Sequence, residues 1–99
     1  MQIDKKREGD RLTIALDGEL GLATAPDLSK VVNEELSGVT ELIFDMENLQ
    51  YTSSAGLRVL LMAQQIMDKQ GSMTLRHVND AVMEIFEETG FTDFLDIED

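Results

Sequence analysis

The sequence predicts one α/β domain over residues 1–99, built on a mixed sheet of four or five strands with about three helices, mainly on one face. Three observations predict it. Residues 11–18 alternate apolar and polar side chains, which is the period of a half-buried strand. Three later segments place apolar residues at helical spacing between a capping residue and a glycine. Strand and helix patterns alternate along the chain, which favours parallel strands joined by right-handed crossovers.

Before residue 40 the pattern predicts a hairpin followed by a helix. The expected elements are a weak strand, a tight turn, a stronger strand and a helix, over residues 1–7, 8–10, 11–18 and 24–38. Thr24 is a candidate cap for this helix, Pro26 fits its first turn and Gly38 suits its exit. Because hairpins join antiparallel strands and crossovers join parallel ones, the sheet is expected to be mixed.

After residue 40 strands and helices alternate. The expected elements are a central strand, a helix, a strand, a helix and a short last strand, over residues 40–47, 54–71, 72–78, 79–90 and 91–97. The first of these strands is a short apolar run, which is typical of a strand covered on both faces. The last helix has Asn79 as its cap and Gly90 as its stop.

The charge balance is strongly acidic. Twenty Asp and Glu residues against eight Lys and Arg give a formal net charge of −12. Such a surface repels phosphate backbones, so nucleic acid is not an expected partner, whereas opposite charge would speed encounter with a basic protein. The other interpretation is that the charge only keeps the domain soluble. The chain after His77 carries acids but no Lys or Arg, and its interspersed apolar residues indicate an acidic helix face.

Other residue types exclude several function classes. Without cysteine there is no disulfide and no thiolate chemistry, and a single histidine, His77, argues against a zinc or transition-metal site. The glycines match no phosphate or dinucleotide loop, so no cofactor is expected. No apolar run reaches the length of a membrane span, and the charged N-terminus lacks the apolar region of a secretory signal. We therefore expect a cytoplasmic protein that does not bind membranes.

The stretch NLQYTSSAGLRVLL, residues 48–61, places two serines where the central strand gives way to a helix. Thr52 or Ser53 is then the N-cap, and Ser54 lies in the first turn. A helix N-terminus has free N–H groups and a partial positive charge, so it accommodates an anion such as a phosphate on Ser54. Arg58, four residues on, points to the same side of the helix as Ser54.

Three roles for the serines are open at this point: a helix cap, a nucleophile and a phosphorylation site. A nucleophilic serine needs a base, yet the only histidine, His77, lies on another predicted strand, and no G-x-S-x-G elbow is present. Asp45 lies near a strand end, as a phosphoaspartate would, but no acidic cluster lies near the first strand. Its carboxylate is expected to bind backbone amides of the following loop instead.

Two motifs make the whole chain resemble the bacterial anti-sigma factor antagonists, the STAS domain family. DGELGLATAPDL resembles the family's loop after the second strand, which begins Gly-Glu-Leu. LIFDMENLQYTSSAGLRVLL resembles the family's signature, in which an apolar strand, an aromatic and a serine-rich turn precede Gly-Leu at the start of a helix. The order of predicted elements also matches the STAS fold. The resemblance implies a regulator of transcription that binds partners and is not an enzyme.

In that family, an anti-sigma factor that is itself a serine kinase phosphorylates a serine at this turn. The unphosphorylated antagonist binds that factor and frees the sigma factor. Aligned on Gly56 and Leu57, the acceptor falls on Ser54, with Ser53 as the runner-up. The resemblance implies partner-binding positions at Gly21, Thr24, Thr52, Ser53, Ala55, Gly56 and Arg58.

Two positions depart from the best-known members, which carry Asp where this chain has Gly21 and Ser53. The alternative to a phosphorylated antagonist is a STAS scaffold or small-ligand binding module that phosphorylation does not control. In either case a monomer or weak dimer is expected.

Overall fold

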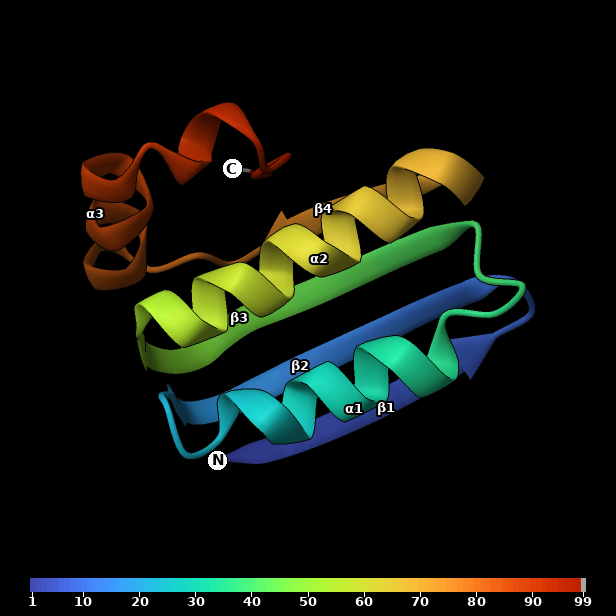
Figure 1. Cartoon of the computed structure of the whole chain (residues 1–99), viewed down its shortest axis with the longest axis horizontal. Helices are drawn as coiled ribbons and strands as arrows, with labels where there is room; N and C mark the ends of the chain where they lie inside the picture. The colour runs from blue at the N-terminus through green and yellow to red at the C-terminus, as the bar shows by residue number, and fades with distance from the viewer. Residues whose placement is uncertain (99) are drawn as a thin grey trace.

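The computed structural model describes residues 1–98, which form a four-stranded sheet, three α-helices and one short 3-10 helix (Figure 1). The elements in chain order are β1 (Gln2–Glu8), β2 (Arg11–Leu20), α1 (Ala25–Glu35), β3 (Glu41–Thr52), α2 (Ser54–Gln70), β4 (Ser72–Arg76), α3 (Asp80–Thr89) and η1 (Phe91–Asp93). The expected α/β class and helix positions are confirmed. No helix in this part of the chain has both the length and the hydropathy that a membrane span requires.

The sheet is mixed, as predicted. Its strands lie in the order β1-β2-β3-β4, with β1 antiparallel to β2 and the other neighbours parallel. Helices α1 and α2 lie side by side over one face of the sheet, and α3 lies beyond one end of α2 (Figure 1). The carboxyl ends of β2 and β3 therefore meet at the same end of the molecule as the start of α2.

The core lies between the sheet and these helices. Alternate residues of β2 are buried, namely Leu12, Ile14 and Leu16, while Thr13 and Ala15 between them are only half-buried. The same cluster takes in apolar side chains of the helices and of the neighbouring strands, among them Leu28, Val32, Phe44, Leu60, Met73 and Phe86. The period of two in β2 thus places its larger side chains on the helix-covered face.

The predicted last strand over residues 91–97 is wrong. Gly90 adopts a left-handed conformation with φ of 78°, and the chain then turns through η1. Phe91 and Leu95 face inward with helical spacing, and the Leu95 N–H donates to the Phe91 carbonyl at 3.0 Å. Only Ile97 returns to the sheet, through one isolated bridge to Leu75. A short aromatic-rich run was therefore misread as a strand, which periodicity alone does not resolve.

The central strand β3 is longer than predicted, because it runs on to Thr52. Its extension pairs with an extension of β2, where Leu20 lies opposite Thr52, and the ladder passes two register shifts on the way. This extension carries polar residues such as Asn48 and Gln50, which the sequence pattern alone places in a loop. The consequence is that β3 leads directly into α2.

His77 lies outside the strand in which the sequence pattern places it. It lies just past β4, is exposed and has a positive φ of 57°. Its Nδ1 lies 3.0 Å from Oδ1 of Asp45, and this hydrogen bond and the charge of Asp45 raise the pKa of His77 above its ordinary value. Glu47 adds to the rise and Arg76 opposes it. Asp45 also accepts from the Glu47 N–H at 3.1 Å, so the expected bond to a backbone amide forms, but within β3 and not in a following loop.

The raised pKa predicts a pH dependence of stability. The native state favours protonated His77, so its contribution is complete below the unfolded pKa of about 6.5 and is lost as the pH rises through the folded pKa. We expect His77→Asn, which tolerates the positive φ, to lower the free energy of unfolding at pH 5.5 and to match the native chain at pH 8.5. Urea denaturation at both pH values measures this. A deficit that is equal at both would show that the Asp45 contact does not depend on protonation.

Candidate functional site

The turn between β3 and α2 is a tight junction that presents one serine. Ser53 is the N-cap of α2: its backbone is extended, and its Oγ accepts from the Gly56 N–H at 3.4 Å. Its own N–H donates to the Leu20 carbonyl at 2.9 Å. Both groups of Ser53 are thus engaged in the junction, and a serine is found there because its hydroxyl satisfies a free amide of the helix.

Ser54 is the first residue of α2 and is exposed. Among the hydrogen bonds of residues 1–98, none involves its hydroxyl, which leaves that oxygen open to chemistry from outside. Arg58 is exposed one turn further along the helix, and no carboxylate within the described residues lies at ion-pair distance from it. Ser54 thus combines a solvent-facing hydroxyl, a helix N-terminus and a nearby cation.

The loop between β2 and α1 is held by Thr24. The Thr24 hydroxyl donates to the Glu19 carbonyl at 2.9 Å and accepts from the Gly21 N–H at 2.8 Å. Thr24 occupies the N-cap position of α1 as predicted, but its side chain makes no capping bond to the helix, because the hydroxyl is engaged within the loop. Gly21 is half-buried and would have room for a Cβ. Thr24 therefore positions the loop.

Two of the sequence-predicted positions lie beneath this surface. Thr52 is 1% exposed and Gly56 is buried. A Cβ built on Gly56 would lie 2.6 Å from Cγ of Leu20 and closer still to the Thr52 hydroxyl. In this structure both residues pack the start of α2 against the ends of β2 and β3, while Ala55 is half-buried above them. They support the surface from below, so a partner would not touch them directly.

Two exposed apolar side chains at this end were missed by sequence reasoning. Leu22 is 81% exposed in the loop, and Tyr51 is 47% exposed at the end of β3. Tyr51 pairs with Glu19 in the ladder, so the strand end and the loop are neighbours. The sequence did offer one signal, because Leu22 precedes α1 and does not belong to the apolar stripe of that helix. We call Leu22, Tyr51, Ser54 and Arg58 the strand-end face.

The nucleophile hypothesis finds no support in the geometry. The only imidazole, on His77, bonds to Asp45, which lies seven residues before Thr52 on β3. At about 3.3 Å per strand residue, that is roughly 20 Å from the turn. Ser54 therefore has no histidine base.

A second cluster consists of Asp45, Glu47 and His77, whose ligand atoms lie within 4.8 Å of one another. All three side chains are partly or fully open to solvent, and Asp45 is already bonded to the other two residues. We interpret this cluster as a hydrogen-bonded contact between the middle of β3 and the residue that follows β4.

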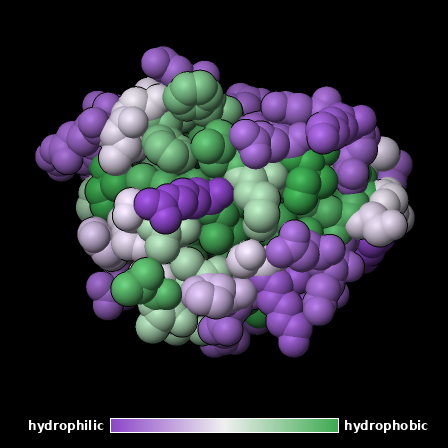
Figure 2. All heavy atoms as spheres, in the orientation of Figure 1, coloured by the Kyte–Doolittle hydropathy of each residue, from purple (hydrophilic) through white to green (hydrophobic). Residues whose placement is uncertain are grey.

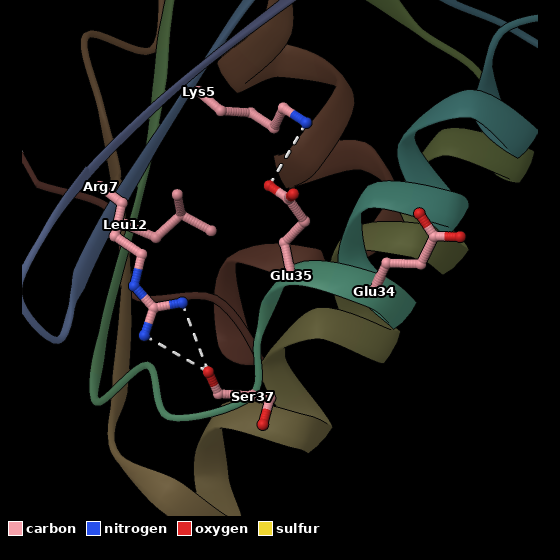
Figure 3. Close-up of a pocket in the computed structure, with 6 residues that line it drawn as sticks. All are labelled: Lys5, Arg7, Leu12, Glu34, Glu35 and Ser37. Atoms are coloured by element: carbon pink, nitrogen blue, oxygen red, sulfur yellow. Dashed lines mark hydrogen bonds and ion pairs between the residues drawn. The ribbon is translucent and has the colours of Figure 1, made fainter.

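A polar groove of about 470 Å³ lies between β1 and the end of α1 (Figure 3). Lys5 forms an ion pair with Glu35 at 3.3 Å, and the Arg7 guanidinium donates to the Ser37 carbonyl at 3.4 Å. The groove lies at the opposite end of α1 from the Gly21–Thr24 loop. Its cations are already partnered within the chain, so it offers little to a charged small ligand.

The sequence matches a known domain family and several named proteins. Residues 3–96 match the family model described as "Mlab, STAS domain". BtrV from Bordetella bronchiseptica is 33% identical over 93 residues, which cover 92% of this chain and 80% of BtrV. The anti-sigma-B factor antagonist of Listeria monocytogenes is 29% identical over 96 residues, covering 94% of this chain and 83% of that protein.

Solved structures share the fold. The anti-sigma factor antagonist SpoIIAA in its unphosphorylated form has a TM-score of 0.74 at 17% identity, over 99% of this chain and 88% of that one. Its phosphorylated form has a TM-score of 0.68 at 17% identity, over 99% of this chain and 92% of that one. At this identity the likeness concerns the fold alone.

Proposed function

This chain belongs to the STAS domain family, and on that premise we propose that it is an anti-sigma factor antagonist switched off by phosphorylation of Ser54. In its unphosphorylated form it binds an anti-sigma factor that is a serine kinase, and the sigma factor is released. The chemistry belongs to the kinase. This chain supplies the acceptor hydroxyl and the surface that the kinase recognises.

The observation that carries the proposal is the exposed, unengaged Ser54 hydroxyl at the first position of α2. Of the two serines, Ser53 already caps the helix and bonds to Leu20, so Ser54 is the better acceptor. The relatives supply the rest of the support: the Listeria protein is named an anti-sigma-B factor antagonist, and SpoIIAA is described in a phosphorylated form.

The strand-end face suits a protein partner. Exposed Leu22 and Tyr51 offer apolar contact area on either side of the junction, and tyrosine is enriched in binding hot spots. The loop that bears Leu22 is ordered by Thr24, and the Ser53 N–H ties the loop's base to the turn. A preorganised surface loses little entropy on binding, which favours affinity.

A phosphate on Ser54 is compatible with the fold. It adds about −1.5 to −2 charge next to the amides of the helix N-terminus, where an anion is stabilised. Arg58 lies one turn away without a competing carboxylate among the described residues. The switch then acts on the partner surface and leaves the domain folded.

The modification itself is tested on protein recovered from its own cells and separated on a phosphate-affinity gel. We expect a retarded band for the native chain and for Ser53→Ala, and none for Ser54→Ala, because of the two serines at the turn only Ser53 has its hydroxyl engaged, by the Gly56 N–H. Ser53→Ala is the matched control, since it removes a neighbouring hydroxyl. Loss of the band in Ser53→Ala alone would move the acceptor to Ser53. No band in any sample would favour the alternative of a STAS module that phosphorylation does not control.

A further inference from the structure

The outer side of α3 and the segment that follows it carry charge of one sign. Residues 78–98 contain seven Asp and Glu and no Lys or Arg. Within the described residues, only Glu98 of these acids is in an ion pair, with Arg76 at 3.2 Å. The exposed acids of α3 follow one side of the helix at helical spacing, at Asp80, Glu84, Glu87 and Glu88. The exposed charged side chains of α3 are therefore all negative.

Two of these acids lie at the carboxyl end of α3, where a negative side chain is unfavourable. Glu87 and Glu88 lie in the last turn of α3, which has no basic residue. The carbonyl end of a helix is partially negative, so carboxylates there are repelled by the helix dipole as well as by each other. A cation bound from outside would reduce both penalties.

The segment after α3 holds an aromatic side chain out in solvent. Phe94 is 62% exposed and touches Phe91 edge to face, with ring centroids 6.3 Å apart. The backbone that carries it is ordered, because Phe94 N–H bonds to the Phe91 carbonyl at 3.0 Å and Leu75 N–H bonds to the Asp96 carbonyl at 2.9 Å. Figure 2 shows apolar atoms at the upper edge of the molecule, next to hydrophilic ones. An ordered segment thus offers one large apolar side chain for contact with a partner.

From these observations we propose that α3 and the segment after it form a second docking surface, which accepts a basic, amphipathic segment of a protein partner. We call Glu84, Glu87, Glu88, Phe94 and Asp96 the α3 surface. Lys or Arg side chains of the partner lie against its carboxylates, and an apolar side chain packs on Phe94. Its charge rejects nucleic acids and anionic membranes. It shares no residue with the strand-end face.

The test uses the whole protein and two fluorescein-labelled peptides of fourteen residues. One has Leu and Lys at amphipathic helical spacing, and the other has Ser in place of Leu at the same charge. We expect Glu87→Gln with Glu88→Gln to weaken binding of the Leu/Lys peptide at least tenfold in fluorescence anisotropy. The control is Asp10→Asn with Glu34→Gln, which changes net charge equally at two exposed acids far from α3. We expect that control to change affinity less than twofold.

Phe94→Ser separates the apolar contact from the charge. The substitution is expected to weaken binding of the Leu/Lys peptide at least fivefold and to leave the affinity for the Ser/Lys peptide unchanged. Equal losses in the two double variants would show that the peptide responds only to net charge, and would overturn the proposal. No effect of Phe94→Ser, or no binding by the native chain, would overturn it as well. Self-association of the native chain that is lost in the Glu87/Glu88 variant would identify a second copy as the occupant, and would contradict a basic partner segment.

Discussion

Replacing Gly56 by valine is expected to lower the free energy of unfolding by about 3 kcal/mol, through overpacking at the start of α2. A Cβ at this position would lie 2.6 Å from Cγ and 2.8 Å from Cδ2 of Leu20. It would meet the Thr52 hydroxyl at closer range still. Leu20 and Thr52 are 0% and 1% exposed, so neither side chain has free space to turn into. The start of α2 would have to move away from the sheet.

Two controls make this prediction specific to the site. Gly21→Ala adds a Cβ where nothing lies within 4 Å, so it is expected to leave stability unchanged or to raise it by about 0.4–1 kcal/mol. Gln65→Ala removes an exposed side chain from the polar side of α2 and is expected to change stability by less than about 0.5 kcal/mol. Urea denaturation followed by circular dichroism measures all three. A Gly56→Val midpoint equal to that of Gln65→Ala would refute the packing argument.

The same displacement has a consequence for binding. Ser54 and Arg58 of the strand-end face lie in the first turns of α2. Moving the start of α2 therefore displaces both side chains. We therefore expect Gly56→Val to weaken partner binding more than Gln65→Ala does, although Gly56 itself is buried and lies outside the contact.

The start of α2 was predictable from sequence because its signals are local. A serine before an apolar helical pattern is a cap, and the spacing from Ser54 to Arg58 fixes which side of the helix they share. The class of fold followed from the same kind of signal, since periods of two and of 3.6 residues alternate along the chain. These patterns depend only on near neighbours in sequence, so a single chain reveals them.

What sequence reasoning missed depends on contacts between distant segments. The polar end of β3 is a strand only because the end of β2 pairs with it, from Asp17 to Leu20. Thr24 was expected to cap α1, yet its hydroxyl is engaged by Glu19 and Gly21. Residues 91–97 have strand-like composition, but the left-handed Gly90 directs them into a turn.

Phosphorylation of Ser54 is expected to weaken binding of the anti-sigma factor at least a hundredfold, which corresponds to about 3 kcal/mol. A partner surface that packs on the small residue Ala55 and on the exposed Tyr51 has no space prepared for a solvated dianion. Steric exclusion, desolvation and repulsion from acids of a nucleotide-binding partner all act in the same direction. Ser54→Asp carries less charge and fewer acceptor oxygens, so its loss should be smaller than that of the phosphoprotein.

Ser54→Ala is expected to bind as the native chain does and to resist inactivation by the kinase. The hydroxyl of Ser54 makes no hydrogen bond within residues 1–98, so its removal leaves the junction intact. Stability serves as the control here. Because the helix N-terminus accommodates the anion, the phosphoprotein and the Asp variant should unfold at nearly the same urea concentration as the native chain. A much lower urea midpoint for either protein would mean that its loss of binding results from unfolding.

We propose that charge on Ser54 decides whether the strand-end face binds its partner. The most direct measurement is a calorimetric titration of the purified anti-sigma factor with three samples: the Ser54→Ala chain, the Ser54→Asp chain and the chain phosphorylated on Ser54. We expect native affinity for the first, weaker binding for the second and a loss of affinity of a hundredfold or more for the third. Equal affinity in all three would contradict the proposal, and would leave Ser54 as no more than the first residue of α2.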